Sequence, residues 1–400
     1  MPRYGTAAQR HSVFADVPSE RRLHSFMSTK KLGLTSLFVF CLLATGCGGG
    51  STGSPGGGSS PAAERDAVYA LSDAGNGQVQ IFVFDAETNS LTLSASPAGP
   101  PGGFDTAVNA SAHFFYAADF DSGAVYGYSY DSGSGNLSAL NNSPYAAIGP
   151  SSNGGPLAIN PAGTFLFHSN AFGAIGSYSI NSNGSLAATT NPLVNDCIQP
   201  LHMLVAPSGN FLYVADHGSG DYCVYSIDSS TGALTEISGS PFMSLPNSEP
   251  WGLVFGSGGT FLYSTLSNAE KVDGFSIDGT SGSLTALAGE PYPAGGIPQG
   301  LAIGANGKYL YVGDDNGGAI SIFSIDQTTG ALTPNGTLSG GNPSNLAVSP
   351  SGNFLFAVGI PSQQVVVYSI APSTGGLTMI ASATMSGSSN LPAMAVVALN

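Results

Sequence analysis

The sequence predicts an all-β chain built from seven repeats of one four-stranded unit. An aromatic-rich segment recurs at residues 68–71, 114–117, 165–168, 211–214, 261–264, 309–312 and 354–357. Its third aromatic positions are 45 to 51 residues apart, which is the length of a four-stranded propeller blade. Charged residues make up only 8% of the chain, whereas 56 Gly and 26 Pro are typical of strands joined by tight turns. We therefore expect a seven-bladed β-propeller, with four antiparallel strands per blade, over residues 64–400.

Each repeat presents its strands in the same order. An apolar inner strand such as 346–348 runs into a Pro-x-Gly turn, and the aromatic strand follows. A third strand alternates in polarity, as in 224–227, and leads into an Asp-x-x-Thr-Gly turn at 228–232. A short fourth strand carrying Leu-Thr closes the unit at 234–235. Period-2 patterning bounded by Gly, Pro, Asn and Asp indicates a meander of strands without intervening helices.

The two ends of the repeat region predict how the ring closes. The first unit begins at its aromatic strand and has no inner strand before it, whereas residues 391–399 resemble an isolated inner strand. Pairing the C-terminal strand with the first unit completes the first blade, and the ring then has seven blades. It also removes the exposed strand edges that an open sheet must protect.

The start of the chain predicts export and lipid anchoring. Lys30 and Lys31 precede a 12-residue apolar stretch at 32–43, which is short for a membrane span and typical of a signal peptide. The stretch ends in Leu-Ala-Thr-Gly-Cys, which resembles a lipobox with Cys47 as the lipidated residue. We expect residues 1–46 to be a signal segment, with 1–26 an over-extended start, and residues 47–63 to be a flexible Gly/Ser/Pro linker. The protein would then be attached to the cell envelope, at the outer membrane or the periplasmic or extracellular face.

The charge balance excludes nucleic acid as a partner. The whole chain carries −15, and residues 1–46 hold six Lys/Arg and two acids, a net of +4, so the remainder carries −19. Only Arg65, Lys271 and Lys308 remain as cations. Binding to nucleic acid requires Lys and Arg to neutralise phosphates, and binding to anionic headgroups requires similar charge. We therefore expect contact with the membrane through the lipid anchor alone.

The repeat resembles the seven-bladed lactonase family, which includes propeller-type 6-phosphogluconolactonase and carboxymuconate-cyclising enzymes. The local match is strongest in the fourth unit, where Gln199-Pro200-Leu201-His202 precedes the inner strand and residues 216–221 form an Asp-x-Gly-containing loop. The resemblance implies that His202 is a candidate catalytic residue. The ligand-binding set predicted around it consists of Gln199, His202, Asp216, His217 and Asp221.

The fifth unit departs from the family pattern. The family often has Gly-Pro-Arg-His there and a strand ending Asn-Glu, whereas this chain has Glu249-Pro250-Trp251-Gly252 and Leu266-Ser267. No arginine follows Arg65. A phosphorylated or polycarboxylate lactone needs cations to hold its anionic groups and to stabilise the oxyanion. Phosphogluconolactone is therefore a poor candidate substrate.

Two functions remain open at this point. In the first, the propeller binds a small molecule, glycan or protein at its top face, the end where the inner strands begin, without efficient catalysis. In the second, it hydrolyses a neutral lactone with His202 as general base on water. We expect no cofactor and no metal, and a monomer. The acidic loops at 119–121 and 314–315 resemble solvated turns more than a calcium site, because neither has a full ligand set.

The last expectation is a disulfide between Cys197 and Cys223. Cys197 precedes the inner strand of the fourth blade and Cys223 begins its third strand. In an up-and-down meander these two points lie at the same end of the blade. Export supplies an oxidising compartment, and Cys47 would be acylated. Two independent buried thiols are the alternative.

Overall fold

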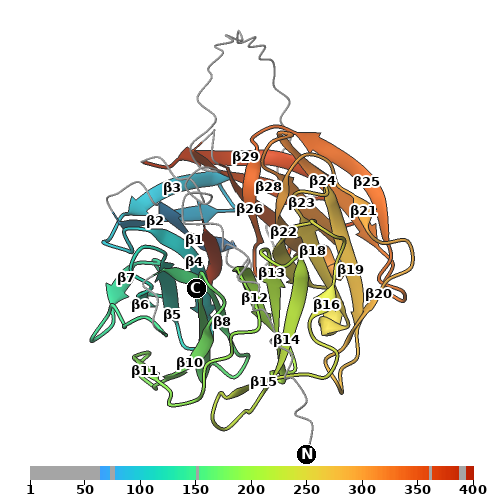
Figure 1. Ribbon diagram of the computed structural model, residues 1–400. Helices are drawn as coiled ribbons and strands as arrows, with labels where there is room; N and C mark the ends of the chain where they lie inside the picture. Colours follow the sequence, from blue (N-terminus) through green and yellow to red (C-terminus); the bar gives the residue numbers. More distant parts are fainter. Residues whose placement is uncertain (1–63, 73–76, 150–152, 360–362, 387–392) are drawn as a thin grey trace, which may run out of the picture. The chain divides into compact units, whose positions relative to one another are not determined.

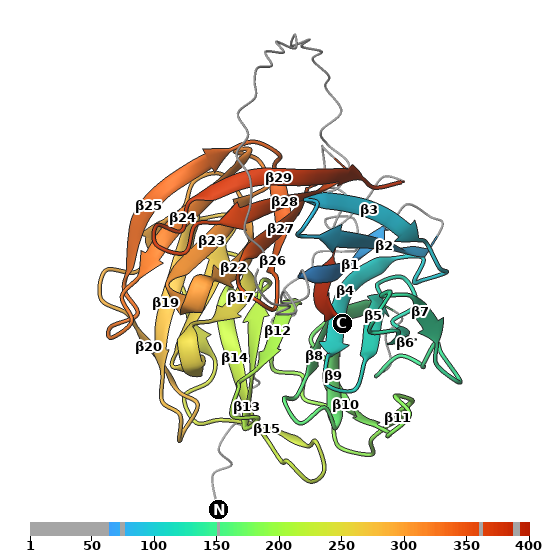
Figure 2. The same cartoon turned by 180° about the vertical axis from the view of Figure 1, so that it is seen from behind.

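The computed structural model describes residues 64–72, 77–149, 153–359, 363–386 and 393–400. Within them the strands form seven antiparallel sheets arranged as the blades of a ring (Figures 1 and 2). This confirms the predicted seven-bladed, all-β propeller. The predicted signal segment, the linker and Cys47 lie outside the described residues. None of the described residues forms a helix long and apolar enough to cross a membrane.

The strands follow one another along the chain in the order that the sequence predicted. The strands of blades 1 to 3 are β1 (Arg65–Ser72), β2 (Gln78–Asp85), β3 (Ser90–Ala95), β4 (Gly103–Asn109), β5 (Phe114–Asp119), β6 (Val125–Tyr130), β7 (Leu137–Ala139), β8 (Gly154–Ile159), β9 (Phe165–Asn170), β10 (Ile175–Ile180) and β11 (Leu186–Ala188). Those of blades 4 and 5 are β12 (Pro200–Val205), β13 (Phe211–Asp216), β14 (Asp221–Ile227), β15 (Leu234–Glu236), β16 (Phe242–Met243), β17 (Pro250–Phe255), β18 (Phe261–Leu266), β19 (Lys271–Ile277), β20 (Leu284–Ala286) and β21 (Tyr292–Pro293). Blades 6 and 7 contain β22 (Pro298–Gly304), β23 (Tyr309–Asp314), β24 (Ala319–Ile325), β25 (Leu332–Ser339), β26 (Pro343–Val348), β27 (Phe354–Gly359), β28 (Gln364–Ile370) and β29 (Leu377–Thr384), and β30 (Met394–Leu399) follows them. Short 3-10 turns occupy Ser257–Gly259 and Ala305–Gly307.

Blade 1 is assembled from both ends of the propeller. Its strand order is β3-β2-β1-β30, and β30 pairs antiparallel with β1 from Arg65↔Leu399 to Ala70↔Met394. The C-terminal strand is therefore the inner strand of the first blade, as the sequence predicted. Blades 4 and 5 differ slightly from the prediction, because the short strands β16 and β21 add a fifth strand beside β14 and β19.

The aromatic second strands pack between neighbouring blades and fix the ring. In five blades the tyrosine hydroxyl at the third aromatic position donates to a glycine carbonyl in a turn of the next blade. The pairs are Tyr69–Gly135, Tyr116–Gly184, Tyr213–Gly282, Tyr263–Gly330 and Tyr311–Gly375, at 2.7–2.9 Å. Each of these glycines has positive φ, between 68° and 81°, which explains why these turns end in glycine. Blades 3 and 7 carry Phe167 and Phe356 at this position.

The inner strands share an irregularity near their first residue. In β4, β8, β12, β17, β22 and β26 the register shifts one to three residues after the strand begins. A bulge of this kind bends the strand and re-aims the side chains beside it. The unpaired residues therefore project differently from a regular period-2 strand, and they build the site described next.

Candidate functional site

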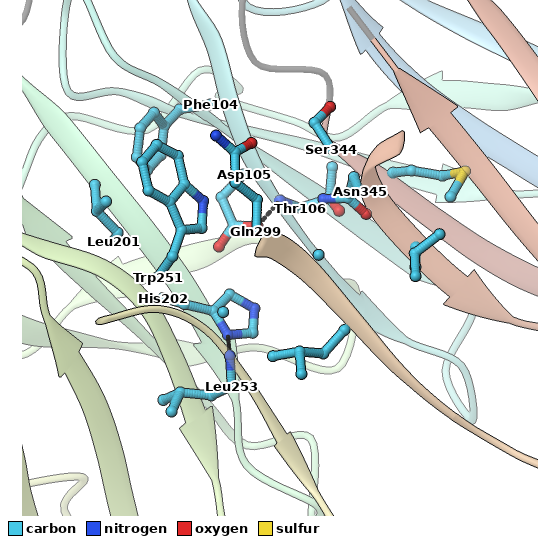
Figure 3. A pocket seen from close by; sticks show the side chains of 15 residues that line it. Phe104, Asp105, Thr106, Leu201, His202, Trp251, Leu253, Gln299, Ser344 and Asn345 are labelled. Atoms are coloured by element: carbon cyan, nitrogen blue, oxygen red, sulfur yellow. Dashed lines mark hydrogen bonds between the residues drawn. The ribbon is translucent and has the colours of Figure 1, made fainter. Parts of the chain in front are cut away.

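A cavity of about 280 Å³ lies among the inner strands, close to the ends where they begin (Figure 3). Its walls come from six blades. The lining residues are Phe104, Asp105, Thr106, Leu201, His202, Trp251, Gly252, Leu253, Gln299, Gly300, Leu301, Ser344, Asn345, Leu346 and Met394. More than half of them are the bulge residues or their immediate neighbours in β4, β12, β17, β22 and β26.

His202 lines this cavity, and one nitrogen of its ring already accepts a hydrogen bond from the backbone. The backbone N–H of Leu253 in the neighbouring blade donates to His202 Nδ1 at 3.0 Å. Because Nδ1 accepts this hydrogen bond, the neutral ring carries its proton on Nε2. Burial lowers the pKa of His202 to about 4, so the ring is neutral at physiological pH. His202 is therefore prepared to donate a hydrogen bond from Nε2 and poorly prepared to remove a proton from water.

Asp105 is the carboxylate of the cavity, and the sequence analysis missed it. Its Oδ1 accepts the N–H of Thr106 at 2.7 Å, and its Oδ2 accepts the N–H of Leu157 in the next blade at 2.9 Å. Burial raises the pKa of Asp105 to about 7, although both backbone hydrogen bonds act in the opposite direction. The side chain therefore changes its charge near neutral pH, which gives it a proton to exchange in the cavity.

Asp105 and His202 occupy equivalent positions in blades 2 and 4. Each is the third residue of its inner strand. Each accepts a hydrogen bond from the backbone N–H of a leucine in the next blade: Leu157 donates to Asp105, and Leu253 donates to His202. A buried N–H without a partner is costly, so both side chains help to hold neighbouring blades together. At the same position of blade 5, Gly252 leaves room for β22, since a Cβ there would lie 2.5 Å from the carbonyl oxygen of Gln299.

Aromatic and amide groups complete the walls. Trp251 and Phe104 present rings, and Gln299, Ser344 and Asn345 present amide and hydroxyl groups (Figure 3). Gln299 is 5% exposed, and its Oε1 accepts no hydrogen bond from any group in the described part of the chain. A buried amide oxygen of this kind favours a partner from within the cavity. The lining residues include no Lys or Arg.

The rest of the predicted site lies behind or beside the cavity. Asp216 is fully buried, and its carboxylate accepts the N–H groups of Ile198, Gln199 and Gly218 and the hydroxyl of Ser219 at 2.5–3.1 Å. Asp221 Oδ1 lies 2.8 Å from the Ser219 hydroxyl oxygen, and burial raises the pKa of Asp221. The cavity wall contains none of Gln199, Asp216, His217 and Asp221. Of the five predicted ligand-binding residues, only His202 lines it.

The neighbouring acidic loops correct a second expectation. Asp119 and Asp314, predicted to lie in solvated turns, are 2% and 5% exposed. Asp119 accepts the N–H of Gly102 at 2.8 Å, and Asp314 accepts that of Ile297 at 2.9 Å. Like Asp216, each ends the second strand of its blade and fixes the loop that leads into the inner strand. The prediction was wrong for these two residues because a carboxylate at a strand end can satisfy backbone donors without solvent.

Cys197 and Cys223 are bonded to each other in the structure, with their Cα atoms 6.2 Å apart. Ligand atoms of these cysteines and of Asp216 lie within 4.8 Å of one another, which is a possible metal-ligand spacing. The bonded sulfurs offer no thiolate, and four protein donors occupy the Asp216 carboxylate. This group therefore does not suit a metal ion, and it serves instead to join the start of β14 to the segment before β12.

The missed residues carry a signal that alignment of the repeats could have revealed. Placing the six bulged strand starts beside one another puts Asp105 at the position of His202, and Phe104 and Gln299 at that of Trp251. The second unit, with Gly103-Phe104-Asp105-Thr106, lacks the proline that begins four of the others and so was overlooked.

The seven blades and the cavity among their inner strands define a seven-bladed β-propeller with one candidate binding site. The family model described as "Lactonase, 7-bladed beta-propeller" matches residues 61–247, 202–297 and 250–392, so the chain belongs to this family. The resemblance inferred from the fourth unit is thereby confirmed. No curated protein matches the sequence.

Solved structures share the fold at low identity. A Bacteroides fragilis protein described as a candidate 6-phosphogluconolactonase is 21% identical, with a TM-score of 0.71 over 86% of this chain and 100% of its own. The periplasmic gluconolactonase of Pseudomonas aeruginosa is 20% identical, with a TM-score of 0.70 over 84% and 99%. Hydrazine synthase of Kuenenia stuttgartiensis is 18% identical, with a TM-score of 0.54 over 75% and 94%. Since proteins with different names share the architecture, these likenesses establish the fold alone.

Proposed function

We propose that this propeller binds a neutral sugar or sugar lactone in the channel cavity without efficient hydrolysis. The observation that carries the proposal is the engagement of His202 Nδ1 by the Leu253 N–H, which leaves His202 as a donor rather than a base. Two aromatic rings and several amide and hydroxyl groups suit the apolar face and the hydroxyls of such a ring. The absence of Lys and Arg from the lining residues disfavours phosphorylated or carboxylated ligands.

The test is a titration of the purified protein with matched neutral and anionic compounds. Glucose and glucono-1,5-lactone represent the neutral ring, and gluconate and 6-phosphogluconate represent the anions. We expect the neutral compounds to bind, the anions to bind at least 10-fold more weakly, and the lactone to open no faster than in buffer. Gln299→Leu should weaken binding, and Gln327→Leu, an exposed glutamine in the Asp326–Gly330 turn, is the matched control. Preference for the anions would overturn the proposal.

Hydrolysis of a neutral lactone is the second candidate, and the raised pKa of Asp105 favours it. In this mechanism the Asp105 carboxylate takes a proton from water as the oxygen attacks the lactone carbonyl carbon. His202 Nε2–H stabilises the developing oxyanion. The ring C–O bond then breaks, and the leaving oxygen takes the proton from Asp105, which gives the open hydroxy acid and restores the carboxylate. A hydrolysis rate that falls by about 100-fold or more in both His202→Ala and Asp105→Asn would establish this candidate over the first.

We further propose that the domain acts at the cell envelope through a lipid on Cys47. The support is the apolar stretch followed by Leu-Ala-Thr-Gly-Cys and the Gly/Ser linker after it. Cys47→Ser should leave the propeller folded and release it into the soluble fraction. A serine variant that remains in the membrane fraction would contradict this proposal.

A further inference from the structure

Trp251 is the chain's only tryptophan, and it lies between the cavity and two titratable side chains, those of His217 and Glu249. On one side its indole lines the cavity (Figure 3). On the other side the ring of His217, from the turn between β13 and β14, meets it edge-to-face, with centroids 5.6 Å apart and planes at 82°. His217 Nε2 in turn lies 3.6 Å from Glu249 Oε2. The three side chains form a chain of contacts from Glu249 through His217 to the cavity wall.

The backbone around Glu249 is held in an uncommon conformation. Glu249 has a φ of 55°, in the left-handed region that non-glycine residues seldom adopt. Its carbonyl accepts both the N–H and the hydroxyl of Ser267, at 3.2 and 3.1 Å, and Pro250 follows it directly. Blade 7 has Asn342 at the equivalent position before Pro343, also with positive φ. The fifth blade thus keeps the conformation with a glutamate, whose longer, charged side chain reaches His217.

His217 is the more buried member of this pair, so its charge state depends on its surroundings. His217 is 20% exposed and Glu249 38% exposed. Burial lowers the pKa of His217, whereas the carboxylates of Glu249 and Asp216 act to raise it. These two carboxylates are the charged groups that act on the ring, one from the segment before β17 and the other from the end of β13. His217 also receives support from its own backbone, since its N–H donates to the Gln199 carbonyl at 3.1 Å.

We infer that His217 and Glu249 are positioning residues that set the orientation of Trp251, so that ligand binding at the cavity depends on the protonation of His217. A protonated His217 forms a full ion pair with Glu249 and places a positive charge beside the indole. A neutral His217 keeps the edge-to-face contact with the indole, but it interacts more weakly with the Glu249 carboxylate because the ion pair is lost. The inference rests on the proposed function for its ligand, but the ring contact itself exists in the free protein.

The free protein provides the decisive test, because all tryptophan fluorescence comes from Trp251. Emission is recorded from pH 4 to pH 8 for the wild type, His217→Gln and Glu249→Gln, in an Asp105→Asn background that removes the neighbouring cavity carboxylate. Beyond the titration of His202 near pH 4, we expect one transition that disappears in His217→Gln. The same transition should move to lower pH by about half a unit or more in Glu249→Gln, since a carboxylate that favours the charged imidazole is lost.

His113→Asn is the matched control. His113 is an exposed histidine with positive φ, which Asn tolerates, and its ring contacts Tyr130 instead of a tryptophan. This variant should leave the emission profile unchanged. Identical profiles for the wild type and His217→Gln, or an unshifted transition in Glu249→Gln, would overturn the inference.

The ligand arm separates this inference from the proposed function. With glucono-1,5-lactone as the probe, His217→Gln should weaken binding about 3- to 10-fold at pH 7, the scale of a lost aromatic ring contact. Binding that is unchanged in this variant would contradict the inference while leaving the proposed function standing. If no neutral sugar or lactone binds the wild type, the proposed function fails, and the pH profiles of the free protein still decide whether His217 and Glu249 position Trp251.

Discussion

His202 accepts the backbone N–H of Leu253 through its Nδ1 atom, across the boundary between blades 4 and 5. Asp105 makes the equivalent contact with Leu157 across the boundary between blades 2 and 3. The same position of the repeat thus performs a structural task with two different side chains. Any chemistry proposed for His202 must be compatible with this structural task. Substituting His202 alters both the cavity and the contact between blades 4 and 5.

The first prediction separates these two roles by stability. His202→Ala leaves the Leu253 N–H without its partner and should lower the free energy of unfolding by about 1–3 kcal/mol. His202→Asn should lose less, because the amide oxygen of a short side chain can accept this N–H as Asp105 does in blade 2. Urea unfolding midpoints measure both. Equal losses in the two variants would show that the hydrogen bond to Leu253 is not what His202 contributes.

The second prediction concerns the pH dependence of stability. The folded protein holds the Asp105 proton up to about pH 7, whereas the unfolded chain releases it near the ordinary value of 3.8. The folded state therefore binds more protons between about pH 4 and 7, and this contribution to stability is lost as the pH rises through that window. In Asp105→Asn the decline in the free energy of unfolding from pH 4 to pH 8 should be smaller by about 2–4 kcal/mol.

Denaturant unfolding at the two pH values checks this difference directly. Thr106→Val, which changes a neighbouring cavity residue without altering a titratable group, should retain the wild-type slope. An Asp105→Asn variant with an unchanged slope would mean that Asp105 titrates alike in the folded and unfolded states.

The third prediction is that the disulfide forms in the oxidising compartment to which the proposed signal segment would direct the protein. Cys197 and Cys223 are 26 residues apart, and closing a loop of that length restricts the unfolded chain enough to stabilise the fold by about 3–4 kcal/mol in the chain-entropy model. Non-reducing peptide mapping of protein isolated from the envelope should recover the two cysteines in one linked fragment. Free thiols at both positions would refute the bridge, and Cys197→Ser with Cys223→Ser should then melt like the wild type.

The fourth prediction tests ring closure. Deleting residues 388–400 removes β30, which pairs with β1 over six residue pairs. The exposed edge of β1 and the loss of buried Met394, Val397 and Leu399 should lower the melting temperature markedly and promote association. Phe242→Ser, which weakens only the short edge strand β16, should lower the melting temperature much less. A truncated protein that melts at the wild-type temperature would contradict the closure by β30.

The sequence predicted the architecture well because the information is repeated. Seven aromatic strands with regular spacing specify the number of blades. A first unit without an inner strand, together with an isolated inner strand at the C-terminal end, specifies how the ring closes. The cavity was harder to predict, since the side chains that face it are selected by bulges. A bulge breaks the period-2 rule at Phe104–Asp105 and at Trp251–Gly252, so an alternating pattern assigns those side chains to the wrong face. The contact of His217 with Trp251 joins a turn of blade 4 to the inner strand of blade 5, and no local pattern indicates it.

The five tyrosine hydroxyls that reach into the next blade leave two boundaries without such a bond, those after Phe167 and Phe356. Each missing bond represents about 1 kcal/mol, so we expect amide hydrogen exchange to be faster along these boundaries than along the other five. They divide the propeller into an arc of blades 1–3 and an arc of blades 4–7. Asp105 belongs to the first arc, whereas His202, Trp251 and Gln299 belong to the second. A ligand that touches both would act as a clamp across the two arcs, and its binding would slow exchange at residues far from the cavity.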